Sequence, residues 1–204
     1  MQNFDEGYIK YRIFWKESGA KSFAGLPQLI KVRNQLYKSG MIGAYQNGIG
    51  FGNISCRVKE NKFIISGTQT GSVEKLNEKH FSMVEDCDLQ KNELICSGPV
   101  KASSEAMTHF AFYVSDENIQ SVIHVHHEVL WNALLNKVPT TGNDIAYGTP
   151  DMANAIAEII QSQNSTSPKI IVTAGHEDGI FTYGNSIENA FEDLMFYYNQ
   201  IVEQ

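Results

Sequence analysis

The sequence has few cysteines, and their spacing matches no cysteine-based framework. Among its 204 residues it contains three cysteines, Cys56, Cys87 and Cys96. An odd number without Cys-x-x-Cys spacing indicates neither a disulfide framework nor a cysteine zinc site. We therefore expect buried, reduced thiols.

The sequence also lacks basic runs and a long apolar stretch at its start. Sixteen basic against 23 acidic residues give a formal net charge of −7, and no run of Lys and Arg interleaves with aromatic residues. Neither nucleic acid nor an anionic membrane is therefore expected as a partner. Residues 1–11 have no sustained apolar segment, so neither a secretory signal nor a membrane span is indicated, and a cytoplasmic location is expected.

What the composition does contain is typical of a globular protein. Hydrophobic residues make up 42% and charged residues 19% of the chain, which argues against disorder or a fibre. A length of 204 residues suits one domain better than two. We expect a single domain over residues 1–204, in which residues 1–24 form an N-terminal arm.

Apolar periodicity predicts strands and helices that intermix along the chain. Helices are predicted at residues 27–38, at 103–115 with Ser103 or Ser104 as the cap, at 128–135, after Thr149-Pro150, and after Asn185 or Ser186. Strands are predicted at residues 54–58, 63–65, 81–84, 94–96, 121–125, 170–172 and 180–181. Several strands are joined by short turns, so the sheet cannot be purely parallel. A mixed sheet with helices on both faces follows.

The first candidate for chemistry is His124-Val125-His126 at the end of an apolar strand. Period-two geometry sends both imidazoles to one face of the strand, within reach of a single ion. Two strand-end histidines bonded to solvent would leave the same pattern. His127 faces the other way, and a structural role suits it better.

The second candidate is the turn that leads into Ser103-Ser104-Glu105 at a predicted helix start. Free N–H groups and the helix dipole favour anions there, and two hydroxyls add donors, so Ser103 and Ser104 could cradle a phosphate or carboxylate. Ordinary capping serines and a carboxylate that compensates the dipole are the alternative. His109 lies four residues after Glu105, a spacing that suits a hydrogen bond between them.

The third candidate is His176, which has Gly175 before it and Gly179 soon after, on a tight turn between two strands. A side chain on such a turn can be presented to a site. The segment Gly50-Phe51-Gly52-Asn53 could cradle a phosphate with its backbone, but a strand follows it, so it is not a dinucleotide fingerprint.

Together these motifs resemble the class II aldolase/adducin family over roughly residues 25 to 200. Five motifs of that family occur in order, which is more specific than any one of them. They are Gly52-Asn53-Ile54-Ser55, Thr70-Gly71, Ser103-Ser104-Glu105, His124-Val125-His126 and Gly175-His176. Ser66-Gly67 competes with Thr70-Gly71 as the anion-binding turn.

The resemblance implies a three-layer α/β/α fold with a mixed, largely antiparallel sheet, and a metal-dependent lyase of carbohydrate metabolism. Such an enzyme cleaves a carbon–carbon bond of a small hydroxy-carbonyl or sugar-phosphate substrate by a retro-aldol step through a zinc-stabilised enediolate, and is usually a homotetramer. One Zn²⁺ per chain would be held by His124, His126 and His176, with Mn²⁺ or Co²⁺ as alternatives. Glu105 would be the general acid/base. Substrate would be held by Asn53, Thr70, Gly71, Ser103 and Ser104.

The sequence departs from the family pattern in two places, and the function has alternatives. The segment before Ala146-Tyr147-Gly148 is short, so the tyrosine that donates a proton in the family's aldolases has no clear counterpart; for Tyr147, Tyr197 and Tyr198 we favour core packing. Glu177-Asp178-Gly179 follows His176 where sugar aldolases have glycine at once. An epimerase or dehydratase of the same family, or a non-catalytic adducin-like interaction domain, are the competing functions.

Overall fold

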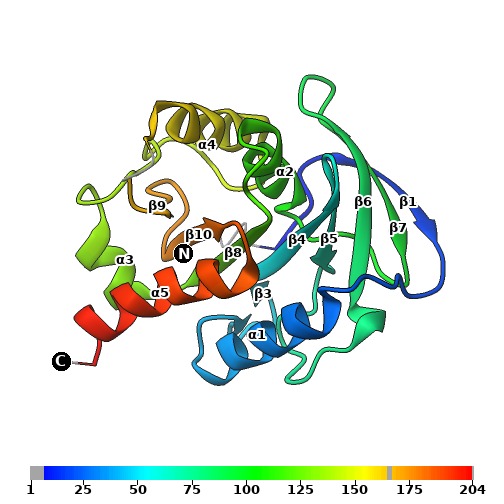
Figure 1. Ribbon diagram of the computed structural model, residues 1–204, viewed down its shortest axis with the longest axis horizontal. Coiled ribbons are helices and arrows are strands. Elements are labelled where there is room, and N and C mark those ends of the chain that lie inside the picture. Colours follow the sequence, from blue (N-terminus) through cyan, green and yellow to red (C-terminus); the bar gives the residue numbers. More distant parts are fainter. Residues whose placement is uncertain (1–6, 165–166, 204) are drawn as a thin grey trace.

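The computed structural model describes residues 7–164 and 167–203, and its central element is an eight-stranded sheet (Figure 1). In spatial order the strands are β1 (Arg12–Glu17), β7 (Glu93–Gly98), β6 (Phe81–Asp88), β5 (Lys62–Ser66), β4 (Asn53–Lys59), β8 (Ser121–His126), β10 (Gly179–Gly184) and β9 (Ile170–Val172). Among these described strands only β1 and β7 pair in parallel, and every other neighbouring pair is antiparallel. The expected mixed, largely antiparallel sheet is confirmed.

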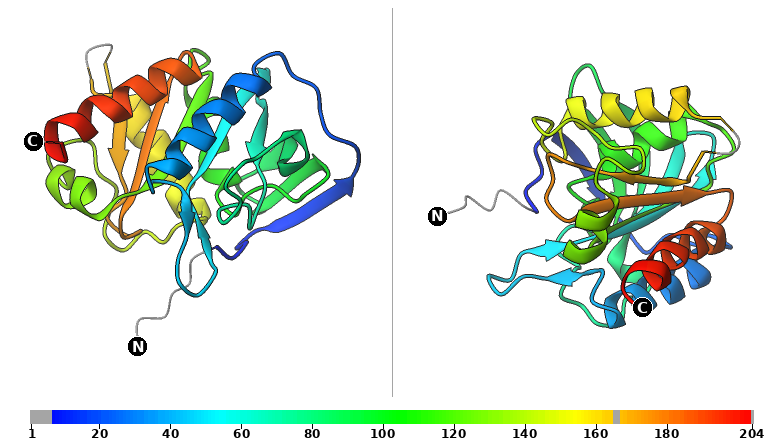
Figure 2. Two further views of the ribbon diagram at one scale, coloured as in Figure 1. Left: turned by 90° about the horizontal axis from the view of Figure 1, so that it is seen from below. Right: turned by 90° about the vertical axis from the view of Figure 1, so that its left-hand side faces the viewer.

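Helices cover both faces of this sheet, so the expected three-layer α/β/α architecture is also confirmed (Figures 1 and 2). One face carries α1 (Leu26–Lys38) and α5 (Ile187–Ile201), with the short α3 (Glu128–Leu134) beside α5. The other face carries α2 (Ala106–Ser115) and α4 (Pro150–Ser162). A 3₁₀ turn, Glu78–His80, precedes β6.

Two apolar cores result, one on each face, and the alternation of β8 assigns its residues between them. Ile123 and Val125 point into the core under α1, α3 and α5, whereas Val122 points into the core under α2 and α4. Because side chains alternate along a strand, His124 and His126 lie on the face of Val122. The two histidines are therefore directed toward α2 and α4.

Strands also occur in two segments for which the sequence predicted none. Within the predicted N-terminal arm, Arg12–Glu17 forms the edge strand β1, whose Ile13 and Trp15 pack against the core under α2. Residues 1–6 of that arm lie outside the described part of the chain. The glycine-rich segment folds into a small hairpin of β2 (Gly43–Ala44) and β3 (Gly50–Phe51). Strand β1 pairs with β7, which is far away in the sequence, and β2 and β3 have only two residues each. Local apolar periodicity predicts neither kind of strand.

Helix α2 begins later, and is more fully buried, than the sequence indicates. The residue at the N-cap position is Glu105, without a side-chain capping bond, so the prediction of Ser103 or Ser104 as the cap is wrong. All residues of 106–113 are buried, whereas Val114, near the end of the helix, is 42% exposed. The helix packs against α4 as well as against the sheet, and this second contact buries residues that would otherwise meet solvent.

The state of the cysteines agrees with the expectation from their number and spacing. Cys56, Cys87 and Cys96 are all free and buried. Burial raises the pKa of the Cys56 thiol to about 12, which keeps it protonated and unreactive. Across the described residues, no helix combines the length and apolar character required to cross a membrane.

Candidate active site

The two histidines of β8 meet at the end of the strand with their rings on the same face. The Nε2 atoms of His124 and His126 lie 3.2 Å apart, and both side chains are buried. The Nδ1 atom of His124 donates to the carbonyl oxygen of Ile180 at 3.2 Å, and that of His126 lies 2.9 Å from Tyr45 Oη in the glycine-rich hairpin. These second bonds orient both rings so that Nε2 faces the centre of the group.

His176 joins them from the turn between β9 and β10. The turn is held by Thr173, whose hydroxyl donates to the carbonyl oxygens of His176 and Gly179 at 3.2 and 2.8 Å. One possible ligand atom from each of His124, His126 and His176 lies within 4.8 Å of the others, a separation that suits coordination of one metal ion.

Glu105 lies against this histidine group from the start of α2. Its Oε2 atom is 2.7 Å from His124 Nε2 and accepts a hydrogen bond from Asn53 Nδ2 at 3.1 Å. Its Oε1 atom is 3.6 Å from His176 Nδ1. Burial raises the pKa of Glu105, but His124 and His176 lower it more, so the pKa lies below its ordinary value and the carboxylate is ionised.

The donor set fits a divalent cation on chemical grounds. His124 Nδ1 is assigned the ring proton because it faces a carbonyl oxygen. In the neutral ring Nε2 is therefore unprotonated and carries a lone pair. That lone pair faces the Glu105 carboxylate at 2.7 Å, and two acceptors at this distance require a proton or a cation between them. Burial lowers the pKa of His126 well below its usual value, which favours the neutral form that ligates metals.

Two other histidines have structural positions. The predicted bond between Glu105 and His109 is wrong: His109 Nδ1 bonds Ser55 Oγ at 2.6 Å, and Ser55 Oγ bonds Tyr113 Oη at 2.6 Å. Burial lowers the pKa of His109 to about 3, so this ring is neutral. His127 accepts a hydrogen bond from the N–H of Leu130 and caps α3.

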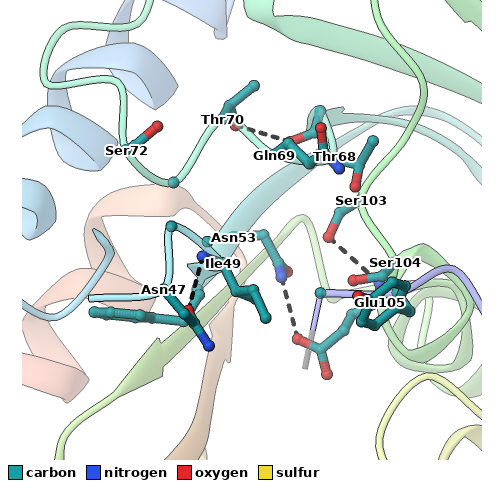
Figure 3. A pocket seen from close by; sticks show the side chains of 18 residues that line it. Asn47, Ile49, Asn53, Thr68, Gln69, Thr70, Ser72, Ser103, Ser104 and Glu105 are labelled. Carbon is teal, nitrogen blue, oxygen red and sulfur yellow. Dashed lines mark hydrogen bonds between the residues drawn. The ribbon is translucent and has the colours of Figure 1, made fainter. Parts of the chain in front are cut away.

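A pocket of about 420 Å³ opens beside Glu105 (Figure 3). All five residues predicted to hold substrate line it, namely Asn53, Thr70, Gly71, Ser103 and Ser104. The histidines are not among its lining residues, so Glu105 connects the pocket to the histidine group. Gly67 of the competing turn also lines it, whereas the Ser66 hydroxyl accepts a bond from Ile54 N at 3.2 Å within the sheet.

Several lining residues were not indicated by the sequence. They are Gly7, Tyr8, Asn47, Gly48, Ile49, Thr68, Gln69 and Ser72. Most belong to the β2–β3 hairpin and the 67–72 segment, which lie on opposite sides of the pocket. Gly50 and Phe51 also line the pocket, as the glycine-rich pattern suggested. The run of polar residues from Thr68 to Ser72 was a signal that could have identified the second wall.

Tyr147 contacts the histidine group, which our expectation of plain core packing did not include. Its ring is buried and stacks on His176 with centroids 4.8 Å apart, and its hydroxyl accepts a hydrogen bond from the N–H of Tyr8 at 3.2 Å. Tyr197 and Tyr198 lie elsewhere: Tyr198 meets the edge of His127, and Tyr197 contacts Phe196.

The chain belongs to the family of class II aldolases and adducin N-terminal domains, because the model of that family matches residues 28–202. No curated protein sequence matches it.

Solved structures of aldolases share the fold. An L-fuculose 1-phosphate aldolase is 18% identical with a TM-score of 0.65, covering 89% of this chain and 86% of its own. A sugar-phosphate aldolase from Thermotoga maritima is 16% identical with a TM-score of 0.63, covering 84% and 89%. The L-fuculose-1-phosphate aldolase from Thermus thermophilus is 20% identical with a TM-score of 0.57, covering 84% and 85%. At these identities the likeness concerns the fold.

The His176 turn yields a prediction about Gly175. A Cβ at this position would lie 2.3 Å from the carbonyl oxygen of Ile145, which is backbone and cannot rotate away. We expect Gly175→Ala to lower the free energy of unfolding by about 2 kcal/mol, as overpacking does. Gly19→Ala is the control, because a Cβ there meets nothing within 4 Å. Urea unfolding of both variants measures the difference, and equal stability would show that the turn tolerates the added methyl group.

Proposed function

We propose that this protein is a metal-dependent lyase that cleaves a carbon–carbon bond of a small hydroxy-carbonyl or sugar-phosphate substrate in a retro-aldol step. The observation that carries the proposal is the convergence of His124, His126 and His176 on one point, with the ionised Glu105 between that point and an open polar pocket. Membership of the class II aldolase and adducin family supports the same reaction class.

His124, His126 and His176 are the proposed ligands of one Zn²⁺ per chain, with Mn²⁺ and Co²⁺ as alternatives. Three neutral imidazoles are the ligand set of many catalytic zinc sites and leave a coordination position open. When bound, the ion would supply a Lewis acid that polarises the carbonyl group of the substrate.

Glu105 is the proposed general acid/base. In a retro-aldol cleavage the β-hydroxyl group of the substrate loses its proton as the carbon–carbon bond breaks. The α-carbon, next to the original carbonyl group, then gains a proton. The Glu105 carboxylate lies at the boundary of pocket and histidine group, where it can carry that proton. Asn53 holds Oε2 in place through its amide, so the other oxygen, Oε1, is the one available for proton transfer.

The pocket is the proposed site for the rest of the substrate. Asn53, Thr70, Gly71, Ser103 and Ser104 present amide, hydroxyl and backbone groups to it. Such neutral donors suit a phosphate, a carboxylate or the hydroxyl groups of a sugar. The similar solved structures include two sugar-phosphate aldolases, which favours a phosphorylated substrate.

Epimerisation or dehydration of a related sugar phosphate is the second candidate reaction, since both need the same histidines and carboxylate; product analysis separates them. An adducin-like interaction domain without catalysis is the third. The buried ionised Glu105 beside three histidines weighs against it, because an interaction domain has no need of such a costly group.

We further propose that residues 1–204 form a single domain and that the enzyme acts in carbohydrate metabolism as a cytoplasmic homotetramer. These parts rest on the family resemblance. Sedimentation at micromolar concentration tests the tetramer directly.

Metal analysis of the purified protein is the first test. We expect about one zinc per chain in the wild type and its loss in His124→Ala, because one of three ligands is removed. His80→Ala, which changes a histidine outside the site, should keep the metal. Absence of metal after reconstitution with zinc, manganese and cobalt would rule out the catalytic proposal.

Removal of the carboxylate tests the role of Glu105. We expect Glu105→Gln to keep the metal and to lower kcat for the cleaved substrate by about 100-fold or more, as loss of a general acid/base does. The assay measures release of the carbonyl product from a panel of sugar phosphates. Turnover close to that of the wild type would assign the proton transfer to another group.

Tyr45 tests the orientation of the metal ligands. We expect Tyr45→Phe to weaken metal binding by about tenfold, because the bond that holds His126 Nδ1 is lost. Competition with a chelator measures the dissociation constant. The control is Tyr198→Phe, whose ring meets His127 outside the site. Equal affinity in the two variants would show that the Tyr45 hydroxyl does not orient the ligand.

A further inference from the structure

An arginine outside the pocket lies directly behind one of its walls. Arg33 of α1 is 1% exposed, and its guanidinium donates to backbone carbonyl oxygens of a single segment. The bonds go to Thr70 at 2.8 Å, Gly71 at 3.1 Å and Glu74 at 3.1 Å, and also to Val73. Arg33 therefore fixes the course of the segment that contains Thr70 and Gly71.

The positive charge of Arg33 lacks a carboxylate partner in the described part of the chain. Among those residues, no Asp or Glu lies within ion-pairing distance of its guanidinium. Its bonds to protein groups go to carbonyl oxygens and, at 3.4 Å, to the amide oxygen of Asn34. Burial lowers the pKa of Arg33 to about 10, which still leaves the group charged at neutral pH. A buried cation without a counter-ion is costly, so an anion nearby would stabilise the folded protein.

The segment held by Arg33 directs N–H groups away from that side chain. In a trans peptide the C=O and the following N–H point in opposite directions. Because the carbonyl groups of Thr70 and Gly71 face Arg33, the N–H groups of Gly71 and Ser72 face away from it. Within the described part of the chain, no acceptor bonds the N–H of Gln69, Thr70, Gly71 or Ser72.

These four residues line the pocket, and no described residue supplies it with a cationic side chain. None of its described lining residues is Lys or Arg, and the charged group among them is the Glu105 carboxylate (Figure 3). Gln69 has a positive φ of 59°, and successive N–H groups around such a residue form a concave anion-binding surface. Attraction for an anion must therefore come from neutral donors, the backbone N–H groups of this segment among them, and from a charge behind the wall.

We propose that Arg33 is the positioning residue of an oxyanion-binding turn at residues 69–72. By holding the carbonyl groups of Thr70 and Gly71 on its own side, Arg33 keeps the N–H groups directed at an oxyanion of the substrate. The negative charge of that anion, on the other side of residues 69–72, then compensates the positive charge of the buried guanidinium. The proposal rests on the proposed function in one respect, namely that the pocket takes the anionic end of the substrate, and it holds for a phosphate or a carboxylate.

Binding of inorganic phosphate to the purified, metal-loaded protein, followed by calorimetry, tests this role. We expect Arg33→Gln to raise the dissociation constant by about tenfold or more, and Arg33→Lys, which keeps the charge but not the fork of donors, to raise it by a smaller factor. Acetate in place of phosphate distinguishes a site for phosphate from one for carboxylates. Metal content, measured on the same samples, reports whether the histidine group is intact.

Arg57 supplies a matched control. Its guanidinium also donates to backbone carbonyl oxygens, of Ile119, Tyr113 and Asp116 among others, but at the opposite end of β4 and outside the pocket. We expect Arg57→Gln to change the phosphate dissociation constant by less than about twofold, since its partners do not line the pocket.

The outcomes separate this inference from the proposed function. Weakened phosphate binding in Arg33→Gln, with Arg57→Gln unchanged, supports it. Equal loss in both variants, equal affinity in Arg33→Gln and the wild type, or no binding of either anion by the wild type would overturn it. Should Arg33→Gln not fold, the comparison of Arg33→Lys with the wild type decides in the same way. A protein that binds phosphate through Arg33 but holds no metal would support the inference and refute the lyase.

Discussion

The register of three neighbouring strands is the constraint on which the candidate site depends. Asn53 of β4 lies opposite His124 of β8, which lies opposite Phe181 of β10, while His126 lies opposite Gly179 at the end of the His176 turn. A slip of one residue would turn His124 and His126 into the core under α1 and α5. Burial of Ile54, Ile123 and Ile180 in that opposite core keeps the three strands in this register. Apolar burial on one face thus places the polar groups on the other.

Charge compensation is the second constraint, because this interior holds an ionised carboxylate. Glu105 is 2% exposed, and its oxygens find Asn53, His124 and His176 in place of water. The arrangement is balanced only when protons or a metal ion sit among the imidazoles. Two residues further along β4, Ser55 forms a separate, neutral chain of hydrogen bonds with His109 and Tyr113. Strand β4 is therefore linked to α2 and its N-cap at two places, through Asn53 and through Ser55.

The pocket has a different origin from the histidine group. Its walls are loops, and each is held by contacts from outside: Arg33 holds the 70–74 segment, and close backbone packing joins Gly71 to the β2–β3 hairpin. A Cβ on Gly71 would lie 2.1 Å from the carbonyl oxygen of Gly43, so only glycine allows this approach. The shape of the pocket therefore depends on the hairpin, which forms one wall, and on α1, which supplies none of the lining residues.

Local sequence patterns were enough to predict most helices and strands and the shared face of His124 and His126. Alternation in residues 121–126 placed His124 and His126 together, Thr149-Pro150 marked the start of α4, and the ordered motifs identified the family and its three-layer fold. Other features were visible only in the folded chain. They are the pairing of β1 with β7, the bond of His109 to Ser55 in place of Glu105, and the stacking of Tyr147 on His176. The positions of Arg33 and Tyr45 behind the site belong to the same group. Periodicity and capping are properties of a few consecutive residues. These contacts join residues that are far apart in the sequence, and they depend on strand register and on how the layers pack.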